Sequence, residues 1–281
     1  MNDEYGQGDN ALTVRITSAE GAPPPVGDNQ HAAFELVALH KEFGGYAAVK
    51  RAHLTVRPGS FYGLVGPNGA GKTTLLSMAV GLQRPDEGRA RVFGIDVWEE
   101  PERAKELMGV LPDGLAMPEQ LTGRELLTYL GRLRGLDRDT VDARADELLA
   151  VLELTGDVER TLVLDYSTGM RKKIGLATAL LHGPRLLVLD EPFEAVDPVS
   201  AVVLKRILNR FVASGGSVVL SSHVMALVEQ LCDTVAVMAK GQVVVEGPVA
   251  EVRGGKTLEE TFVELVGHQT GGEEGLSWLS R

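Results

Sequence analysis

The sequence has few of the features that stabilise a secreted domain through disulfides or anchor a protein in a membrane. Its one cysteine, Cys232, cannot form an internal disulfide, which favours a reducing compartment and a small buried core residue. The first stretch, MNDEYGQGDN, is acidic and polar, whereas a secretory signal would be basic and then apolar. No run approaches the roughly 18 to 20 apolar residues of a membrane helix. We therefore expect any membrane role to depend on a partner.

Positive charge is also scarce. The chain has 28 basic and 39 acidic residues, a formal net charge of −11, and this opposes the counterion-release binding of non-specific nucleic-acid partners. We expect no nucleic-acid partner. What is present is 44% hydrophobic residues in a chain of 281, which is ample for one large domain or two modest ones.

The pattern along the chain favours an α/β fold. Residues 1–32, including GAPPPVGDN, show no sustained period and predict a disordered extension before a main domain over 33–250. FELVALHKEF and AHLTV alternate apolar and polar residues, which predicts an antiparallel edge hairpin turning at GGY. SFYGLV, LLVLD and SVVLSS are instead continuous apolar runs, typical of strands covered by helices on both faces.

Three stretches with helical spacing follow one another between about 113 and 182, which predicts a helical subdomain inserted in the α/β core. The run TVAVMAKGQVVVEGP predicts two strands about a turn at Lys240 and Gly241. Over 251–281 we expect a short helical segment and then an acidic tail.

The segment GPNGAGKT, from Gly66 to Thr73, fits the P-loop pattern between a predicted strand and a predicted helix. Backbone N–H groups of such a loop wrap phosphates, Lys72 adds a point charge, and the Thr73 hydroxyl binds Mg²⁺. A Gly-rich structural turn is the alternative. The predicted nucleotide-binding residues of this segment are Gly66, Pro67, Asn68, Gly69, Ala70, Gly71, Lys72, Thr73 and Thr74.

LLVLDEP ends a buried strand in two adjacent acids. Asp190 would face the Mg²⁺ held by Thr73, and Glu191 would polarise the attacking water. Two neighbouring carboxylates repel unless a cation or a reaction uses them, although a solvated strand end remains possible. SVVLSSH likewise ends at His223, which could hydrogen-bond a γ-phosphate; alone, it could equally be an ordinary surface histidine.

The order of P-loop, helical insert, YSTGM, LLVLDEP, AVDP and SSHVM resembles the nucleotide-binding subunits of ABC transporters, from about Phe34 to Gly247. The resemblance implies a P-loop NTPase (RecA-like) core with an antiparallel β-subdomain and an inserted α-helical subdomain. It also implies the cofactors ATP and Mg²⁺, and catalytic roles for Lys72, Glu191 and His223.

In that family, two nucleotide-binding domains pair head to tail, and the LSGGQ signature of one contacts ATP held by the other. YSTGM occupies that place, so the resemblance implies ATP contacts in trans from Ser167, Thr168 and Gly169. Tyr166, Thr168 and Met170 depart from the consensus. Ser167 is also a good helix cap in its own right. Asp197 matches the D-loop aspartate that links the two sites, or is an ordinary acid before Pro198.

Two further positions are less regular. Family members usually have glutamine directly after LP, near Mg²⁺ and the membrane subunit, but this chain has Asp113 there, as in the drug- and daunorubicin-resistance exporter group. Asp113 is thus a candidate metal ligand, directly or through water, and Gln120 a possible substitute. For adenine stacking, the hairpin offers Phe43 in KEFG, with Tyr46 as the alternative.

The function implied is a transporter ATPase subunit, in a homodimer or heterodimer, acting with a separate membrane permease at the cytoplasmic face of the membrane. The exporter-like context favours export. Two alternatives stay open: a soluble ABC-type ATPase outside transport, and a weakly catalytic, ATP-gated interaction subunit suggested by the variant signature and Asp113.

Overall fold

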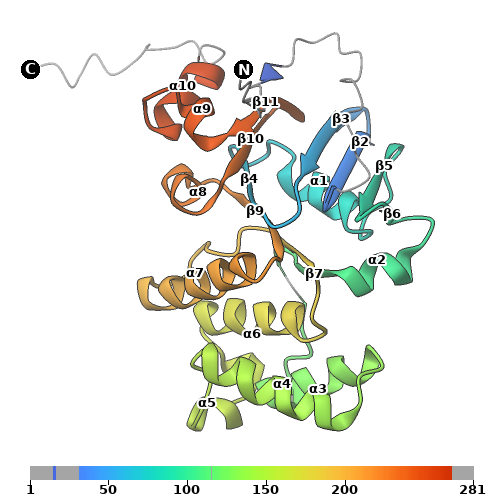
Figure 1. The fold of residues 1–281 in the computed structure, drawn as a ribbon, viewed down its shortest axis with the longest axis vertical. Coiled ribbons are helices and arrows are strands. Elements are labelled where there is room, and N and C mark those ends of the chain that lie inside the picture. The colour runs from blue at the N-terminus through green and yellow to red at the C-terminus, as the bar shows by residue number, and fades with distance from the viewer. Residues whose placement is uncertain (1–14, 17–31, 115, 268–281) are drawn as a thin grey trace, which may run out of the picture.

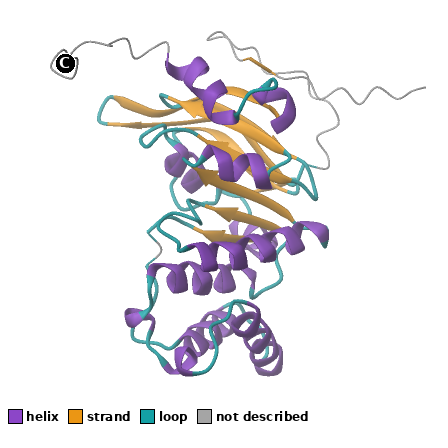
Figure 2. Ribbon diagram, turned by 90° about the vertical axis from the view of Figure 1, so that its left-hand side faces the viewer, coloured by secondary structure: helices purple, strands orange, loops and turns teal. Residues whose placement is uncertain are grey.

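The computed structural model describes residues 15–16, 32–114 and 116–267, and they form two sheets with helices around them (Figures 1 and 2). The larger sheet has seven strands in the order β1-β11-β10-β4-β9-β8-β7. Its strands are β1 (Arg15–Ile16), β4 (Phe61–Val65), β7 (Met108–Leu111), β8 (Leu186–Leu189), β9 (Ser217–Ser222), β10 (Thr234–Ala239) and β11 (Gln242–Pro248).

The five strands from β10 to β7 run parallel, and their continuous apolar sequences are buried on both faces. Alternate side chains divide between two apolar cores. On β4, Phe61 and Val65 enter one core, whereas Tyr62 and Leu64 enter the other. The carboxyl ends of these strands therefore share one edge of the sheet, where ligands of open α/β sheets bind.

The second sheet is antiparallel, in the order β3-β2-β5-β6. It consists of β2 (Phe34–Phe43), β3 (Tyr46–Val56), β5 (Glu87–Val92) and β6 (Ile95–Asp96). The expected hairpin is confirmed as β2 and β3, and their alternation places one face of the sheet against α1 (Lys72–Ala79) and the other toward solvent.

A helical region lies below the larger sheet in the view of Figure 1. It contains α3 (Gly123–Leu133), α4 (Arg138–Val151), α5 (Asp157–Arg160), the 3₁₀ helix η2 (Val163–Asp165) and α6 (Thr168–Leu180). Thr122 and Glu125 form a reciprocal capping box at the start of α3. Helix α6 contacts α3 and α4 on one side and β7 and α7 (Pro198–Ala213) on the other, so it joins this region to the core.

The remaining helices are α2 (Pro101–Leu107), α8 (Met225–Leu231), α9 (Val249–Arg253) and α10 (Leu258–Gly267). The expected helical segment after 250 corresponds to the end of α9 and to α10, and the expected acidic tail, residues 268–281, lies outside the described residues. None of the helices within the described ranges is long and apolar enough to cross a bilayer.

The predicted extension contains one short strand. Within residues 1–32 the structure describes Arg15, Ile16 and residue 32, and Arg15–Ile16 pair antiparallel with β11 as a short strand. This pairing satisfies N–H and C=O groups at what would otherwise be an open sheet edge. The rest of the predicted extension lies outside the described residues. The predicted turn at Lys240 and Gly241 joins β10 to β11 as expected.

Candidate functional site

The predicted P-loop lies between β4 and α1, at the carboxyl edge of the larger sheet. A Cβ atom at Gly66 would lie 2.3 Å from the Met238 carbonyl oxygen. Gly71 has φ +102°, and a Cβ atom there would lie 2.4 Å from the Ala48 carbonyl oxygen. Only glycine fits either position without a shift of the backbone. The loop is therefore held against β3 and β10 on its inner side.

The outer side of the loop is open to solvent. Pro67, Asn68 and Gly69 are exposed, whereas Ala70 is buried and its N–H donates to the Pro67 carbonyl at 3.1 Å. Thr73 is exposed and Thr74 half-buried on the first turn of α1. The structure thus presents the loop backbone as a surface that a phosphate could reach.

Lys72 begins α1 and is only 5% exposed. Its Nζ donates to the Gly66 carbonyl at 2.8 Å and the Pro67 carbonyl at 3.4 Å. It also lies 3.4 Å from Glu191 Oε1, which brings the predicted P-loop lysine and the predicted base together. A buried ammonium is tolerated here because carbonyl oxygens and a carboxylate surround it.

Asp190 and Glu191 follow β8 directly and are both buried. The Ser221 hydroxyl on β9 donates to Asp190 Oδ1 and accepts from the Glu191 N–H at 3.0 Å. Ser221 therefore holds both acids from the neighbouring strand. Glu191 also has φ +46°, a left-handed conformation that is uncommon outside glycine and concentrates at functional sites.

His223 follows β9, and its Nδ1–H donates to Glu191 Oε2 at 3.0 Å. The other carboxylate oxygen, Oε1, is buried and has no hydrogen-bond partner among the described residues. Oε1 faces the Lys72 ammonium at 3.4 Å but accepts no hydrogen bond from it, so it has capacity for one, and a bound water is the smallest group that would supply it. Lys72, Glu191 and His223 thus form one contiguous cluster.

The donor chemistry fits a nucleotide-borne Mg²⁺ better than an all-protein metal site. Within the described ranges no three or more His, Cys, Asp or Glu side chains converge in a way that could hold a metal ion. A hydroxyl at Thr73 and a carboxylate at Asp190 are hard oxygen donors, and Mg²⁺ commonly takes one or two such ligands beside substrate phosphates.

The variant signature lies at the start of α6. Ser167 is the N-cap, and its hydroxyl oxygen accepts from the Met170 N–H at 3.3 Å. Ser167 and Thr168 are exposed. A Cβ atom on Gly169 would lie 2.7 Å from Asp197 Oδ2 and 2.9 Å from Ser200 Oγ. The structure places the signature glycine directly against the predicted D-loop aspartate.

Asp197 is the N-cap of α7, and its Oδ1 accepts from the Ser200 N–H at 2.9 Å. Hydrogen bonds from the Ser200 backbone and hydroxyl lower the pKa of Asp197 below its ordinary value. The carboxylate is therefore charged at neutral pH, at the exposed start of the helix.

Asp113 is separate from the cluster around Glu191. It is exposed, it accepts from the Gly114 N–H at 3.0 Å, and its Oδ1 lies 3.9 Å from Lys172 Nζ. Gln120 is exposed on the same connection between β7 and α3. The structure does not assemble Asp113 with Asp190 and Glu191 as a three-carboxylate metal cluster.

Phe43 and Tyr46 flank the turn between β2 and β3 and pair with each other. Phe43 is 47% exposed and Tyr46 is 60% exposed, so neither is a core residue. Lys41 Nζ lies 5.6 Å from the centroid of the Phe43 ring. Both rings are available for stacking, and the choice of Phe43 stays a prediction.

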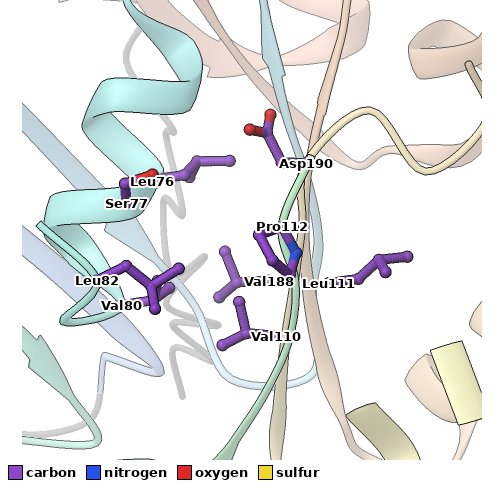
Figure 3. A pocket seen from close by; sticks show the side chains of 9 residues that line it. All are labelled: Leu76, Ser77, Val80, Leu82, Val110, Leu111, Pro112, Val188 and Asp190. Carbon is purple, nitrogen blue, oxygen red and sulfur yellow. The ribbon is translucent and has the colours of Figure 1, made fainter. Parts of the chain in front are cut away.

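A small apolar cavity of about 10 Å³ lies beside the cluster (Figure 3). Figure 3 shows α1 side chains on one wall, Val110, Pro112 and Val188 on the other, and Asp190 at one end. The cavity has room for about one water molecule, so it is a packing gap rather than a nucleotide pocket.

Two residues of this site were missed in the sequence. Ser221 appears only as part of a buried strand, although its place two residues before His223, near the carboxyl end of β9, is a signal that could have pointed to it. Lys172 appears only as part of a basic helix start, yet its Nζ donates to the Glu191 carbonyl at 2.9 Å. No sequence pattern links positions 172 and 191; only the packing of α6 does.

Comparison with known proteins gives one consistent family. Residues 49–194 match the family described as ABC transporter. The chain is 38% identical over 221 residues to the daunorubicin/doxorubicin resistance ATP-binding protein DrrA of Streptomyces peucetius, covering 79% of this chain and 67% of the relative. It is 33% identical over 228 residues to the linearmycin resistance ATP-binding protein LnrL of Bacillus subtilis, covering 80% and 73%.

Solved structures show the same fold. A structure described as the ATP-binding subunit of an ABC transporter superposes with a TM-score of 0.75 at 28% identity, covering 83% of this chain and 99% of that one. A dimeric ATP-binding cassette bound to ADP and Pi superposes with a TM-score of 0.71 at 21% identity, covering 77% and 98%. The chain belongs to the ABC transporter family, as an ATP-binding subunit with an ABC-type ATPase fold.

Proposed function

We propose that this chain hydrolyses ATP between two subunits paired head to tail and drives export through a separate membrane subunit. The cluster of Lys72, Glu191 and His223 beside the glycine loop carries the proposal. It places a cation, a base and a hydrogen-bonding imidazole at one sheet edge, which is the set of groups that phosphoryl transfer to water requires.

In the proposed reaction the loop backbone and Lys72 bind the β- and γ-phosphates. Lys72 would exchange the Gly66 and Pro67 carbonyls and its ion pair with Glu191 for phosphate oxygens, which leaves Glu191 free to accept a proton from the attacking water. His223 orients the Glu191 carboxylate through Oε2 and can hydrogen-bond the γ-phosphate. Thr73 and Asp190 would hold Mg²⁺, which supplies charge neutralisation to the phosphates.

The signature end of α6 supports the head-to-tail arrangement. Ser167 and Thr168 are exposed at a helix N-terminus, where hydroxyl and N–H groups favour an anion. Gly169 and Asp197 touch, so a γ-phosphate bound there would couple the signature to the D-loop of the same subunit. Phe43 is proposed to stack on adenine at the chain's own P-loop.

Export and a membrane partner are supported by what the relatives are named for. The relatives are named for daunorubicin and linearmycin resistance, and a further one for Nod factor export. A permease subunit would place this chain at the cytoplasmic face of the membrane. Co-purification of the tagged chain from detergent-solubilised membranes of its own cells, together with a membrane permease, tests this; a chain that stays unbound would favour the alternative of an ABC-type ATPase outside transport.

The central test is Glu191→Gln. We expect steady-state ATP hydrolysis to fall about 100-fold or more because the amide cannot accept the proton, while ATP binding is retained and a dimer is trapped. Glu194→Gln is the matched control, since Glu194 is exposed on the same loop. Unchanged hydrolysis in Glu191→Gln would refute the role of Glu191 as base.

A second candidate is a weakly catalytic, ATP-gated interaction subunit, favoured by Thr168 and Met170 in the signature. It predicts ATP-dependent pairing with little turnover in the unmodified chain. The same hydrolysis assay separates it from the first proposal, because Glu191→Gln would then differ little from the unmodified chain.

A further inference from the structure

Glu191 is held by hydrogen bonds to its backbone as well as to its side chain. Its N–H donates to Ser221 Oγ at 3.0 Å, and its carbonyl oxygen accepts from Lys172 Nζ at 2.9 Å and from the Glu194 N–H at 3.2 Å. The residue has φ +46°, which costs about 1 to 2 kcal/mol for a side chain of this kind. Contacts with surrounding residues must therefore stabilise Glu191 in this backbone conformation.

Lys172 is the only one of these contacts that comes from the signature helix. It lies on the second turn of α6, five residues after the Ser167 cap, and its side chain is 15% exposed. A hydrogen bond from a charged donor to a mostly buried carbonyl is worth more than one between neutral groups. Through Lys172 the helix that carries Ser167 and Gly169 is tied to the base of its own subunit.

Asp113 is the acid beside this ammonium, with Oδ1 3.9 Å from Nζ. Its carboxylate is 45% exposed and sits outside the cluster of Asp190, Glu191 and His223. A mostly buried lysine needs a counter-charge, and among the described residues Asp113 is the carboxylate within 4.0 Å of it. The acid at this position therefore has a partner on the protein itself.

We propose that Lys172 is a positioning residue for Glu191, and that Asp113 acts as the counter-charge of Lys172 rather than as a metal ligand. This inference rests on the proposed function, because it gives Glu191 the role of base. Lys172 acts through its hydrogen bond to the Glu191 carbonyl: it holds the left-handed turn at Glu191 so that the carboxylate points toward Lys72 and His223. Asp113 helps to hold the ammonium in place.

The test uses the whole 281-residue chain and begins with substitutions at Lys172. Lys172→Met keeps the aliphatic stem and removes the donor; we expect kcat to fall about tenfold with the KM for ATP within twofold, because a charge-assisted hydrogen bond is lost away from the nucleotide. Lys172→Arg should recover at least half of the activity. Lys105→Met, the same change at an exposed lysine outside the site, should leave kcat unchanged.

Asp113→Asn separates the two possible roles of the acid. As a counter-charge it should lower kcat about threefold alone and add nothing to Lys172→Met, since the two side chains then act as a unit. Effects that multiply in the double variant would show that Asp113 acts elsewhere, such as on a cation, and would overturn this half of the proposal.

Amide hydrogen exchange supplies a readout that needs no nucleotide. In Lys172→Met the segment 191–196 should exchange faster, because the Glu194 N–H and the turn at Glu191 lose their support, while α3 and α4 stay unchanged. Unchanged exchange at 191–196, or faster exchange throughout the domain, would overturn the proposal. If the unmodified chain does not hydrolyse ATP, the proposed function fails, and this measurement still decides whether Lys172 positions Glu191.

Discussion

The two phosphate-binding candidates of this chain, the loop after β4 and the start of α6, are built in different ways. A Cβ atom at Gly66 or Gly71 would meet a backbone carbonyl at 2.3 or 2.4 Å, whereas one at Gly169 would meet side-chain oxygens at 2.7 and 2.9 Å. Backbone cannot move without moving a sheet, but side chains can rotate. The first site is held in place by backbone of the same chain; the second can adjust to another surface.

The two sites also differ in the charge and burial of their side chains. Around the loop, Lys72 and Glu191 are buried and paired, so their geometry is set before any ligand arrives. At the start of α6, Ser167 and Thr168 face solvent and offer only a helix cap. The contrast fits a chain that binds its own nucleotide at one site and completes a partner's at the other.

The largest effect should come from Gly71→Ala. Its Cβ would meet the Ala48 carbonyl at 2.4 Å at φ +102°, so we expect the free energy of unfolding to fall by about 3 kcal/mol and ATP binding to be lost. Gly69→Ala is the control, because φ is +79° but nothing lies within 4 Å; it should cost only about 1 kcal/mol. Chemical denaturation measures both free energies of unfolding. Equal losses in Gly71→Ala and Gly69→Ala would contradict the view that the backbone behind the loop cannot move.

Gly169→Ala should have a smaller effect on stability and a different one on function. Asp197 and Ser200 can rotate away from the new methyl group, so we expect at most about 1 kcal/mol of destabilisation. Binding of a fluorescent ATP analogue to the isolated subunit should persist while hydrolysis falls about tenfold, because the contact in trans is displaced. Loss of ATP binding by the isolated subunit would mean that the signature serves the chain's own nucleotide.

The smallest effect concerns His182, where the end of α6 rejoins the sheet. Its Nε2–H donates to the Met108 carbonyl at 3.1 Å, and burial, with the charge of Arg134, lowers its pKa from 6.5 to about 4. Between these values the unfolded chain binds a proton that the folded chain does not. We therefore expect His182 to leave the free energy of unfolding unchanged above about pH 6.5 and to lower it progressively toward pH 4.

His182→Gln removes this titration and keeps a side-chain donor. Between pH 6.5 and 4 we expect the free energy of unfolding to fall less steeply with decreasing pH in the variant. The difference in slope should correspond to at most one bound proton. Denaturant titrations at a series of pH values measure it. An identical pH dependence in both proteins would show that water reaches the seam between α6 and β7, and that this end of the helix is as adjustable as its start.

Much of the fold could be predicted from local patterns. Continuous apolar runs gave the parallel strands β4, β8 and β9, and alternation gave the hairpin of β2 and β3, because burial on two faces or one leaves those signals in sequence. The short strand β1 was missed. Its two residues carry no pattern of their own, and it exists through pairing with the edge of β11.

The site was predictable to the extent that its residues adjoin strand ends. Asp190, Glu191 and His223 follow apolar runs, so the sequence indicates that they share a sheet edge. Asp113 also follows a strand, β7, but it lies beside Lys172 rather than with the two acids. Adjacency to a strand end thus locates a residue at an edge without saying what it touches there.

The sequence by itself determined the inventory and its order: a glycine loop with its lysine, two acids after a buried strand, a histidine after another, and a serine and glycine before a helix. Those are encoded by chain neighbours and by the periods of helix and strand. Tertiary structure alone decided the pairings, namely Ser221 with both acids, Gly169 with Asp197 and Lys172 with the Glu191 carbonyl. These contacts join residues up to 31 positions apart, and only the packing of β8, β9, α6 and α7 sets which side chains meet.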